Sequence, residues 1–407
     1  MVTLDYRHLD WKLISAVFLL SVIGIVTIFS ARYYADSVFK QTYYLRQLLW
    51  FAIALLAFVA VIHFPYRMYE AGAYWAYAFS LALLVLVLMM GSSRMGASRW
   101  FSLGSFSVSP SDIAKVACLL TLSRYLAYTH LPPSSKRRLL LSAILALVPM
   151  VLILKQPDLG TSLVFGMMLM ALWFWSGLSP WYLLLILSPL ASLVTAFYWL
   201  SWAIYFVVLI VFLGLLRPGL LFSIVMVILN LVFGMITPMI WDRLRDYQKM
   251  RILVFLDPGH DPRGAGYQII QSKIAIGSGG ILGRGYLNGS QARLDYLPER
   301  HTDFIFSVFG EEFGLWGALI VVGLFAFIFY RCLRIAVQCR SKFASTVVFG
   351  AMAIIFFQFF VNVGMTLGVM PVTGLPLPFV SYGGTALITS WVLVGLIITL
   401  DYYRSEY

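Results

Sequence analysis

The sequence contains few charged residues, and this scarcity excludes the soluble protein classes. Charged residues make up 11% of the 407-residue chain, whereas hydrophobic residues make up 61%. Soluble domains average about 25% charged and about 45–50% apolar residues, so this composition cannot build a soluble surface. Disordered chains are poor in apolar residues, so disorder is excluded as well. The composition therefore predicts a polytopic membrane protein.

Cysteine is scarce too. The three cysteines, Cys118, Cys332 and Cys339, sit in or beside apolar segments, so no disulfide framework is predicted. The apolar run after Lys12 lacks a convincing small-residue cleavage site, so we interpret it as a first span rather than a cleaved signal. The net charge is +12. Cytoplasmic Lys and Arg account for such an excess in a membrane protein, so we predict no nucleic-acid partner.

Apolar runs of about 20 residues, long enough to cross a bilayer as helices, recur along the chain. We predict twelve spans and, with them, an all-α polytopic membrane protein with about 12 transmembrane helices. The spans are predicted near residues 12–30, 45–63, 71–91, 111–129, 138–155, 159–177, 180–197, 199–216, 219–240, 305–330, 345–368 and 384–402.

The basic residues predict the orientation. An even number of spans places both termini on one side, and basic residues favour the cytoplasmic side. With the N-terminus inside, the inner loops and tails carry Arg7, Lys12, Arg67, Lys136, Arg137, Arg138, Arg217, Arg331, Arg334, Arg340, Lys342 and Arg404. The short outer loops carry only Arg32, Lys40, Arg46, Arg94, Arg99 and Lys155. We therefore expect both termini in the cytoplasm.

One long polar segment, from Trp241 to Asp303, falls outside on this topology. It carries nine basic residues, seven acidic residues and nine glycines. We divide the chain into a first transmembrane bundle at 1–240, an exoplasmic catalytic loop at 241–304, and the last three spans at 305–407, which include a re-entrant motif. Charged chemistry is expected to concentrate in this large exoplasmic loop.

Two stretches of the loop combine charges with turn-forming residues. Asp257 and Asp261 each precede a proline, so each is either aimed into a cleft by a rigid turn or part of an ordinary solvated turn. The Gly-rich run 277–285 does not match a nucleotide-binding fingerprint. Its amides either form an anion-binding concavity, with Lys273 and Arg284 beside it, or belong to a flexible loop.

Charges also occur where the loop meets the spans. The run from Glu299 to Asp303 fits no metal-ligand spacing, so we expect a hydrogen-bonded network that fixes the loop on the next helix. Asp112 and Lys115 are three residues apart and share one helical face near the outer end of a span. Charges inside a span usually face a polar cavity, although Lys115 can also snorkel to the interface or simply pair with Asp112.

The segment from Asn362 to Gly384 contains three prolines and five glycines, which prevent a regular helix throughout. Irregular backbone at membrane depth is tolerated where protein or a water-filled cavity covers it, so we predict a re-entrant wall. A second break, Lys155 to Thr161, carries one acid. From the residues alone, these sites allow an enzyme acting on lipid-linked substrates, a lipid flippase or a polar-substrate transporter.

Several stretches, in this order, resemble the SEDS family (shape, elongation, division, sporulation). The most specific are Asp261-Pro-Arg-Gly-Ala-Gly-Tyr-Gln268, Leu297-Pro-Glu-Arg-His-Thr-Asp-Phe304 and Pro376-Leu-Pro-Phe-Val-Ser-Tyr-Gly-Gly384. The residues 255–258, Phe-Leu-Asp-Pro, resemble the RodA branch more than the FtsW branch. Members usually have ten spans, so the resemblance implies a ten-span core plus an additional hairpin between residues 178 and 240.

The resemblance implies a peptidoglycan glycosyltransferase that polymerises lipid II, an undecaprenyl-pyrophosphate-linked disaccharide-pentapeptide, during cell-wall elongation at the inner membrane. It also implies a class B penicillin-binding protein as the crosslinking partner. The family's essential aspartate matches Asp261, and the glutamate and lysine of its Gln-Pro-Ser-Glu motif fall at Asp112 and Lys115. Here the motif is Ser109-Pro-Ser-Asp112, so the carboxylate is one methylene shorter.

We expect a single inverting displacement with Asp261 as the general base for the attacking hydroxyl. Lys115 and Arg99 are the expected stabilisers of the departing pyrophosphate, and Asp112 positions Lys115. The further predicted substrate-binding residues are Lys273, Gln268, Glu299, His301 and Ser381. No metal site or certain cofactor is predicted, although a divalent cation is compatible with the pyrophosphate. The alternatives are a lipid II flippase and a non-catalytic scaffold for the class B penicillin-binding protein.

Overall fold

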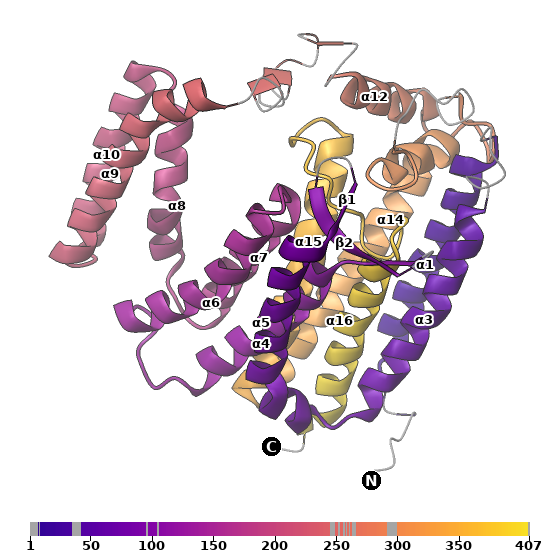
Figure 1. Ribbon diagram of the computed structural model, residues 1–407, viewed down its shortest axis with the longest axis horizontal. Helices are drawn as coiled ribbons and strands as arrows, with labels where there is room; N and C mark the ends of the chain where they lie inside the picture. Colours follow the sequence, from indigo (N-terminus) through magenta and orange to yellow (C-terminus); the bar gives the residue numbers. More distant parts are fainter. Residues whose placement is uncertain are drawn as a thin grey trace.

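The computed structural model is a helical bundle in which every predicted span coincides with a helix (Figure 1). It describes residues 7, 9–34, 42–94, 97–103, 106–244, 249–250, 253–254, 257, 259, 261–262, 266–290 and 299–405. The helices on predicted spans are α1 (Trp11–Arg32), α3 (Tyr43–His63), α4 (Tyr66–Met90), α5 (Pro110–Tyr128), α6 (Lys136–Leu154), α7 (Leu159–Trp175), α8 (Pro180–Thr195), α9 (Trp199–Leu216), α10 (Leu220–Arg243), α14 (Ile305–Gln338), α15 (Lys342–Thr366) and α16 (Gly384–Tyr402).

Not all twelve meet the same criteria for crossing a membrane. Within the described residues, nine helices are long and apolar enough to span a bilayer. The other three depart for visible reasons: α7 and α8 have 17 and 16 residues, and α5 carries three charged side chains. The fold class is confirmed as an all-α polytopic membrane fold. Both termini lie at one end of the bundle, and α12 (Tyr267–Gly279) lies at the other (Figure 1).

The core of the bundle is built around α15 and α16. α16 packs along α3, while α15 packs against α5, α7 and α14. Trp391 of α16 is fully buried, with its ring against Phe51 and Phe58 of α3 and its indole N–H donating to Ser21 of α1. A tryptophan buries well in a core when its N–H finds such a partner.

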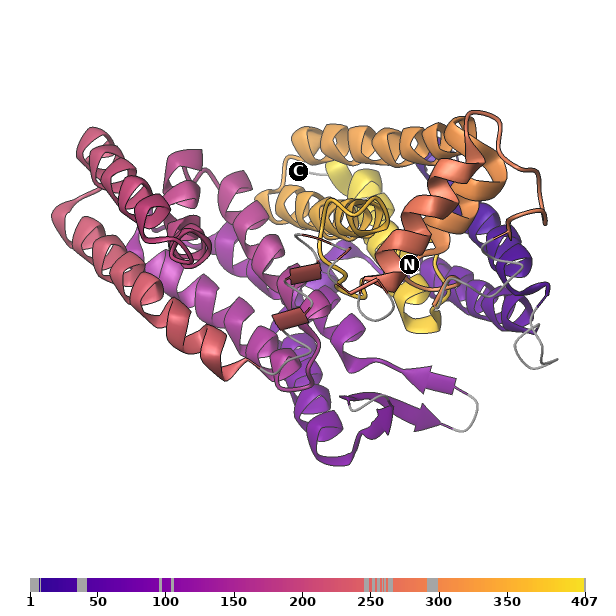
Figure 2. The same cartoon turned by 90° about the horizontal axis from the view of Figure 1, so that it is seen from above.

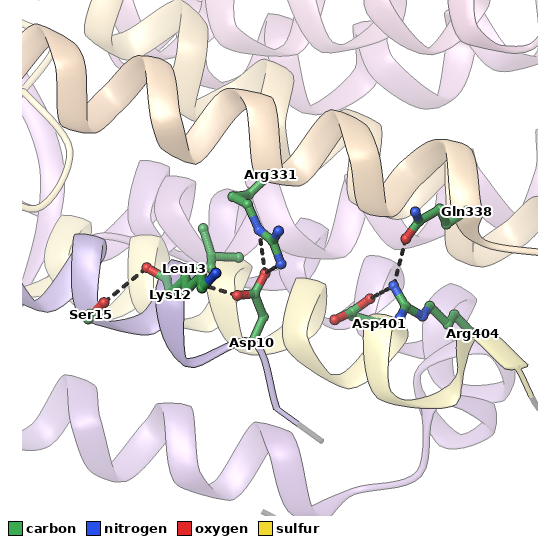
Figure 3. Close-up of polar contacts among 8 residues, drawn as sticks. All are labelled: Asp10, Lys12, Leu13, Ser15, Arg331, Gln338, Asp401 and Arg404. Atoms are coloured by element: carbon green, nitrogen blue, oxygen red, sulfur yellow. Dashed lines mark hydrogen bonds and ion pairs between the residues drawn. The ribbon is translucent and has the colours of Figure 1, made fainter. Parts of the chain in front are cut away.

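A charged clasp joins the ends of α1, α14 and α16 near the termini. Asp10 caps α1 by accepting a hydrogen bond from the Leu13 amide at 3.2 Å, and the Arg331 guanidinium donates to its other oxygen at 2.5 and 2.8 Å. Figure 3 shows this pair beside a second contact, in which Arg404 bridges Asp401 and Gln338. In both contacts the charged side chains are paired, which lets them lie at the edge of an apolar bundle.

The helix α14 is kinked because it packs against a tight Gly-rich turn. Gly314 has φ +62° and ψ −160°, which interrupts the 34-residue helix after its first turns. A Cβ atom at Gly314 would lie 2.3 Å from the Gly283 amide nitrogen, so no larger residue fits there. The portion before the kink carries Glu311 and Glu312, and the portion after it is the apolar span.

The structure adds a small antiparallel sheet that the sequence analysis does not predict. Its strands β1 (Ser92–Arg94), β2 (Ala97–Leu103) and β3 (Phe106–Val108) pair in the order β1-β2-β3, with Leu103 opposite Phe106. The Gly104-Ser105 pair between two alternating segments is a hairpin signal that could have found it. The sheet connects α4 to α5 and carries Arg99.

The helices α8, α9 and α10 form an arm at the edge of the molecule, as Figure 2 shows from above. They have a separate apolar cluster of Leu185, Leu209, Leu213 and Met226. The Asn230 amide donates to Ser188 at 2.8 Å and thereby joins α10 to α8. Such polar contacts hold helices together in lipid, where apolar burial gives no advantage. This arm contains the hairpin expected in addition to the ten-span core.

Candidate functional site

The first part of the site is an ion pair buried at the start of α5. Pro110 opens the helix, and its position leaves Asp112 and Lys115 one turn apart on the buried face. Their side chains meet at 2.6 Å, and the residues are only 7% and 3% exposed. Lys115 therefore does not snorkel to the interface. An ammonium held in this way keeps its charge inside the bundle only because the carboxylate accompanies it.

The second part is Arg99, which β2 places over the turn before α7. Its guanidinium donates to the carbonyls of Gln156, at 3.2 Å, and Pro157, and one nitrogen lies 3.8 Å from a carboxylate oxygen of Asp158. Asp158 also caps α7 by accepting a hydrogen bond from the Thr161 amide. The predicted break at 155–161 thus supplies the carbonyls and the carboxylate that contact Arg99.

The third part is Asp303, which the sequence analysis does not select as a site residue. The amide of Asn362 donates to the Asp303 carbonyl at 3.0 Å and to the Leu375 carbonyl at 2.8 Å. Burial is the main cause that raises the pKa of Asp303 to about 6, and the carboxylates of Glu299 and Asp158 act in the same direction against Arg99. Such a carboxyl exchanges protons near neutral pH, as general acids and bases must.

Glu299 itself shapes the turn that presents Asp303. It has φ +51°, and its carbonyl accepts hydrogen bonds from the amides of Thr302 and Asp303 at 3.1 and 3.2 Å. A non-glycine residue in the left-handed region costs free energy and is often found at functional sites. Its carboxylate is exposed and accepts a hydrogen bond from the Thr302 hydroxyl, so the side chain faces solvent beside the cluster.

His301 lies behind this turn as a buried neutral imidazole. The Arg32 guanidinium can only donate, so Nδ1 of His301, at 2.7 Å, is the acceptor. Burial, followed by the charges of Arg32 and Arg300, lowers the pKa of His301 to about 3. The Tyr43 and Tyr382 rings lie at 5.0 and 5.4 Å from the imidazole. These contacts tie this turn to α1 and to the rings of Tyr43 and Tyr382, whereas the predicted network lies on the next helix.

The non-helical segment between α15 and α16 packs against α1, α7 and the Glu299–Asp303 turn. It passes against α1 and α7 so tightly that a Cβ at Gly24 or Gly160 would lie 2.5 Å from a carbonyl oxygen of the segment. The irregular backbone predicted here is confirmed. The Ser381 hydroxyl donates to the Thr302 carbonyl at 2.6 Å and accepts a hydrogen bond from the Leu377 amide, so it ties the segment to the loop.

Asp261 lies just before α12, on the end of the molecule opposite the termini. Its carbonyl accepts a hydrogen bond from the Gly266 amide at 3.0 Å, and its side chain is partly exposed. Asp257, by contrast, bonds the amide of Gly259 at 2.9 Å in a local turn. Gln268 and Lys273 follow on α12, where the exposed Lys273 side chain lies across Gly368.

The Gly-rich run does not provide the free amides that an anion-binding concavity needs. Gly277 and Gly279 belong to α12, and the amides of Gly280 and Gly283 donate to Gly277 and Gly279. The next two amides, Arg284 and Gly285, donate to the carbonyls of Glu311 and Glu312. At Gly279 and Gly283 a side chain would collide with α14: a Cβ at Gly279 would lie 2.2 Å from the Gly310 carbonyl oxygen.

Among the described residues, no three His, Cys, Asp or Glu side chains gather as they would around a metal ion. The acids lie beside cations instead: Asp112 pairs with Lys115, and Asp158 and Asp303 lie near Arg99. Cationic groups beside carboxylates suit a substrate that carries its own negative charge.

The fold and these contacts define a polytopic membrane protein with charged side chains buried at the end opposite the termini, in addition to the ion pairs near the termini. The family model described as "cell cycle protein", for FtsW, RodA and SpoVE, matches residues 10–206 and 200–406. The chain belongs to this family, and the resemblance drawn from its motifs is confirmed.

Individual relatives agree along nearly the whole chain. The chain is 37% identical over 401 residues to peptidoglycan glycosyltransferase MrdB of Escherichia coli (strain K12), covering 98% of this chain and 95% of that protein. It is 32% identical to peptidoglycan glycosyltransferase RodA of Treponema pallidum (strain Nichols), with 96% and 97% covered.

Solved structures agree as well. One, titled "Structural coordination of polymerization and crosslinking by a peptidoglycan synthase complex", matches with a TM-score of 0.73 and 32% identity, covering 98% of this chain and 99% of that one. The crystal structure of the Thermus thermophilus rod shape determining protein RodA matches with a TM-score of 0.64 and 26% identity, covering 98% of each chain.

Proposed function

We propose that the chain is a peptidoglycan glycosyltransferase that polymerises lipid II into glycan strands during cell-wall elongation. The names of its relatives support the reaction class. The observation that carries the proposal in this structure is the buried pair of Asp112 and Lys115, which keeps a cation inside the bundle. Intramembrane charges of this kind mark a substrate site or pathway, and a lipid pyrophosphate is a substrate that needs one.

In the proposed reaction, the 4-hydroxyl of a lipid II sugar attacks the anomeric carbon of the growing strand. Asp261 takes the hydroxyl proton, the new glycosidic bond forms with inversion, and the bond to the pyrophosphate breaks. Undecaprenyl pyrophosphate leaves with the bonding electrons, and Lys115 and Arg99 stabilise its charge. Asp112 positions Lys115. Lys273, Gln268 and Glu299 are proposed to contact the substrate's polar groups, and His301 and Ser381 to hold the loop that presents them.

A class B penicillin-binding protein is the proposed partner. The similar solved structure titled as a peptidoglycan synthase complex, which couples polymerisation to crosslinking, supports this choice. We place the protein in the bacterial inner membrane with both termini cytoplasmic and the 241–304 loop outside. The excess of basic residues near the termini supports that orientation.

The test is a polymerisation assay on purified protein with lipid II, with and without the cognate penicillin-binding protein. Asp261→Asn should lower the rate by about 10²–10⁴-fold while the fold is kept. Asp257→Asn is the comparison variant, because it removes a carboxylate four residues away that accepts a hydrogen bond from the Gly259 amide. Equal rates for wild type and Asp261→Asn would contradict the assignment and move the base to Asp303 or Asp257.

The same assay separates the alternative functions. If folded wild type makes no strands under any condition but moves lipid II across vesicles, it is a flippase. If it does neither and only raises the activity of its partner, it is a scaffold. Lys115→Met should reduce turnover in the enzyme and leave a scaffold unaffected.

A divalent cation, if used, is proposed to arrive with the substrate. Magnesium is commonly held by one or two carboxylates together with substrate phosphates. Chelation should then lower the polymerisation rate without lowering the melting temperature of the substrate-free protein. A fall in that melting temperature on chelation would instead reveal a resident structural ion.

A further inference from the structure

A cavity opens at the end of the bundle opposite the Asp112–Lys115 pair. It has a volume of about 730 Å³ and lies where α5, α7 and α14 end and α6 and α15 begin. Its lining is Leu126, Ala127, Tyr128, Thr129, His130, Leu131, Pro132, Pro133, Arg138, Trp175, Ser176, Gly177, Cys339, Arg340, Lys342, Ser345 and Thr346. This lining contains three fixed cations and no acid.

The cations of this cavity are held in two ways. Arg138 is buried, and its guanidinium donates to the carbonyls of Leu131 and Leu126 at 3.1 and 3.2 Å, which keeps its charge in the wall. Arg340 and Lys342 are exposed on either side of the residue that caps α15. Throughout the described part of the chain, none of the three forms an ion pair. Their charge is therefore available to an anion.

The depth of the cavity points to a lipid. α5 and α15 run from the charged cluster to this cavity over 19 and 25 residues, or about 28 and 37 Å at 1.5 Å per residue. That is about one hydrocarbon thickness, so the cavity lies at the second membrane boundary. Tyr128, Phe174 and Trp181, which are 60%, 47% and 52% exposed, mark the same level. Aromatic side chains are enriched at this interface.

We propose that this cavity binds the phosphate ester headgroup of an anionic phospholipid from the leaflet on the side of the termini. The phosphate pairs with Arg138, Arg340 and Lys342, and the acyl chains lie along the exposed aromatic residues. Basic pockets between helices on the cytoplasmic side bind acidic lipid headgroups elsewhere by the same chemistry. The volume suits a headgroup together with its glycerol, whereas a free phosphate would leave most of the space unfilled.

The test uses native mass spectrometry of the purified full-length protein with phosphatidylglycerol, phosphatidylcholine or glycerol phosphate as the added probe. The double variant Arg340→Gln/Lys342→Gln should bind phosphatidylglycerol on the order of tenfold more weakly, because each basic residue near such a surface contributes to anionic-lipid binding. Both side chains are exposed, so the fold should be kept. Phosphatidylcholine should bind wild type as weakly as the variant binds phosphatidylglycerol.

The matched control is Lys12→Gln/Arg334→Gln, which removes two exposed cations from the same end of the bundle but outside the cavity. Its phosphatidylglycerol affinity should stay within about twofold of wild type. An equal loss in both double variants would mean diffuse attraction and overturn the site, as would no loss in either. Glycerol phosphate binding as tightly as phosphatidylglycerol would overturn the lipid assignment in favour of a soluble phosphate ester.

Discussion

Carboxylates at the end of this molecule opposite the termini have the same chemistry but different surroundings. Asp112 is neutralised by Lys115 at 2.6 Å. Asp303 lies among other acids, and burial with their charges raises its pKa to about 6. Asp257 accepts a backbone hydrogen bond in an exposed turn. Residue type alone cannot assign these roles, because each role follows from the charges and the solvent around the carboxylate.

The ion pair in α5 makes a prediction that separates stability from activity. Asp112→Asn should lower the free energy of unfolding by about 3–5 kcal/mol, because it leaves the 3%-exposed Lys115 without its counter-charge. Asp112→Glu keeps the charge and should retain most of the stability. Thermal unfolding of the detergent-purified variants measures the difference.

A double variant completes that prediction. Asp112→Asn/Lys115→Met removes both charges and should recover much of the lost melting temperature, since replacing a buried pair with apolar groups is often neutral. Polymerisation should stay low, because the cation is gone. Restored polymerisation in this variant would show that the pair serves the fold alone.

His301 predicts a loss of stability in acid. Its pKa is lowered from 6.5 to about 3, so the unfolded chain binds more protons between these values and the free energy of unfolding should fall as pH decreases. The contribution of His301 to this loss should be roughly 2–3 kcal/mol from about pH 7 to about pH 4.5, and Asp303 opposes it. His301→Gln keeps an acceptor for Arg32 and should remove this contribution, which should flatten or reverse the acid loss of melting temperature.

Asp303 changes the free energy of unfolding with pH in the opposite direction, so it supplies the control. Its pKa is raised from 3.8 to about 6, so the folded protein binds more protons in that window and gains stability as pH falls. Asp303→Asn should therefore steepen the acid loss that His301→Gln flattens. Parallel pH profiles for wild type and His301→Gln would remove His301 as the acid-sensitive group.

At the scale of elements, Gly283 and Gly277 give a matched pair. Gly283 has φ +81°, and a Cβ there would lie 2.1 Å from the Glu312 carbonyl oxygen, whereas a Cβ at Gly277 meets nothing within 4 Å. Gly283→Ala should destabilise by on the order of 3 kcal/mol, from backbone strain and overlap together. Gly277→Ala lies in α12 and should be neutral or stabilising by about 0.5–1 kcal/mol.

Differential thermal unfolding of these two variants tests the role of the Gly-rich run. The polymerisation rate of the surviving fraction should be unchanged in Gly277→Ala. If Gly277→Ala unfolded no later than Gly283→Ala, close packing against the α14 kink would not be the reason for the glycines.

The elements show what the sequence can and cannot predict. The helices at all twelve predicted spans were predictable, because hydrocarbon thickness fixes the length of an apolar run that crosses the bilayer. The Asp112–Lys115 pair was predictable from helical spacing. The meeting of Arg99, Asp158 and Asp303 was not, since these residues lie far apart in the chain and only the tertiary fold joins them. The Gly-rich run suggested an anion-binding site, but close backbone packing also requires glycine. The sequence alone therefore could not distinguish the two roles.

At the scale of the whole molecule, the chain divides its charged groups between two ends of an apolar bundle. The end with α12 (Figure 1) holds acids together with cations. At the end with the termini, Asp10 and Asp401 are paired with Arg331 and Arg404, and the cavity lining carries three cations and no acid. A bundle with this asymmetry can hold a charged lipid at either boundary without carrying charge through its middle. The proposed function therefore depends on which end of the bundle faces the outside of the membrane.

Cysteine labelling tests that direction. Leu282→Cys, at a side chain that is 82% exposed beyond α12, should react with a membrane-impermeant maleimide in intact spheroplasts. Ser134→Cys, exposed in the loop beside the cavity, should react only after permeabilisation. Wild type gives the background, which should be low because Cys118 and Cys332 are buried and Cys339 is half-buried. The reverse pattern would place Asp112, Asp303 and Asp261 on the cytoplasmic side, where a polymerase of exported strands could not use them.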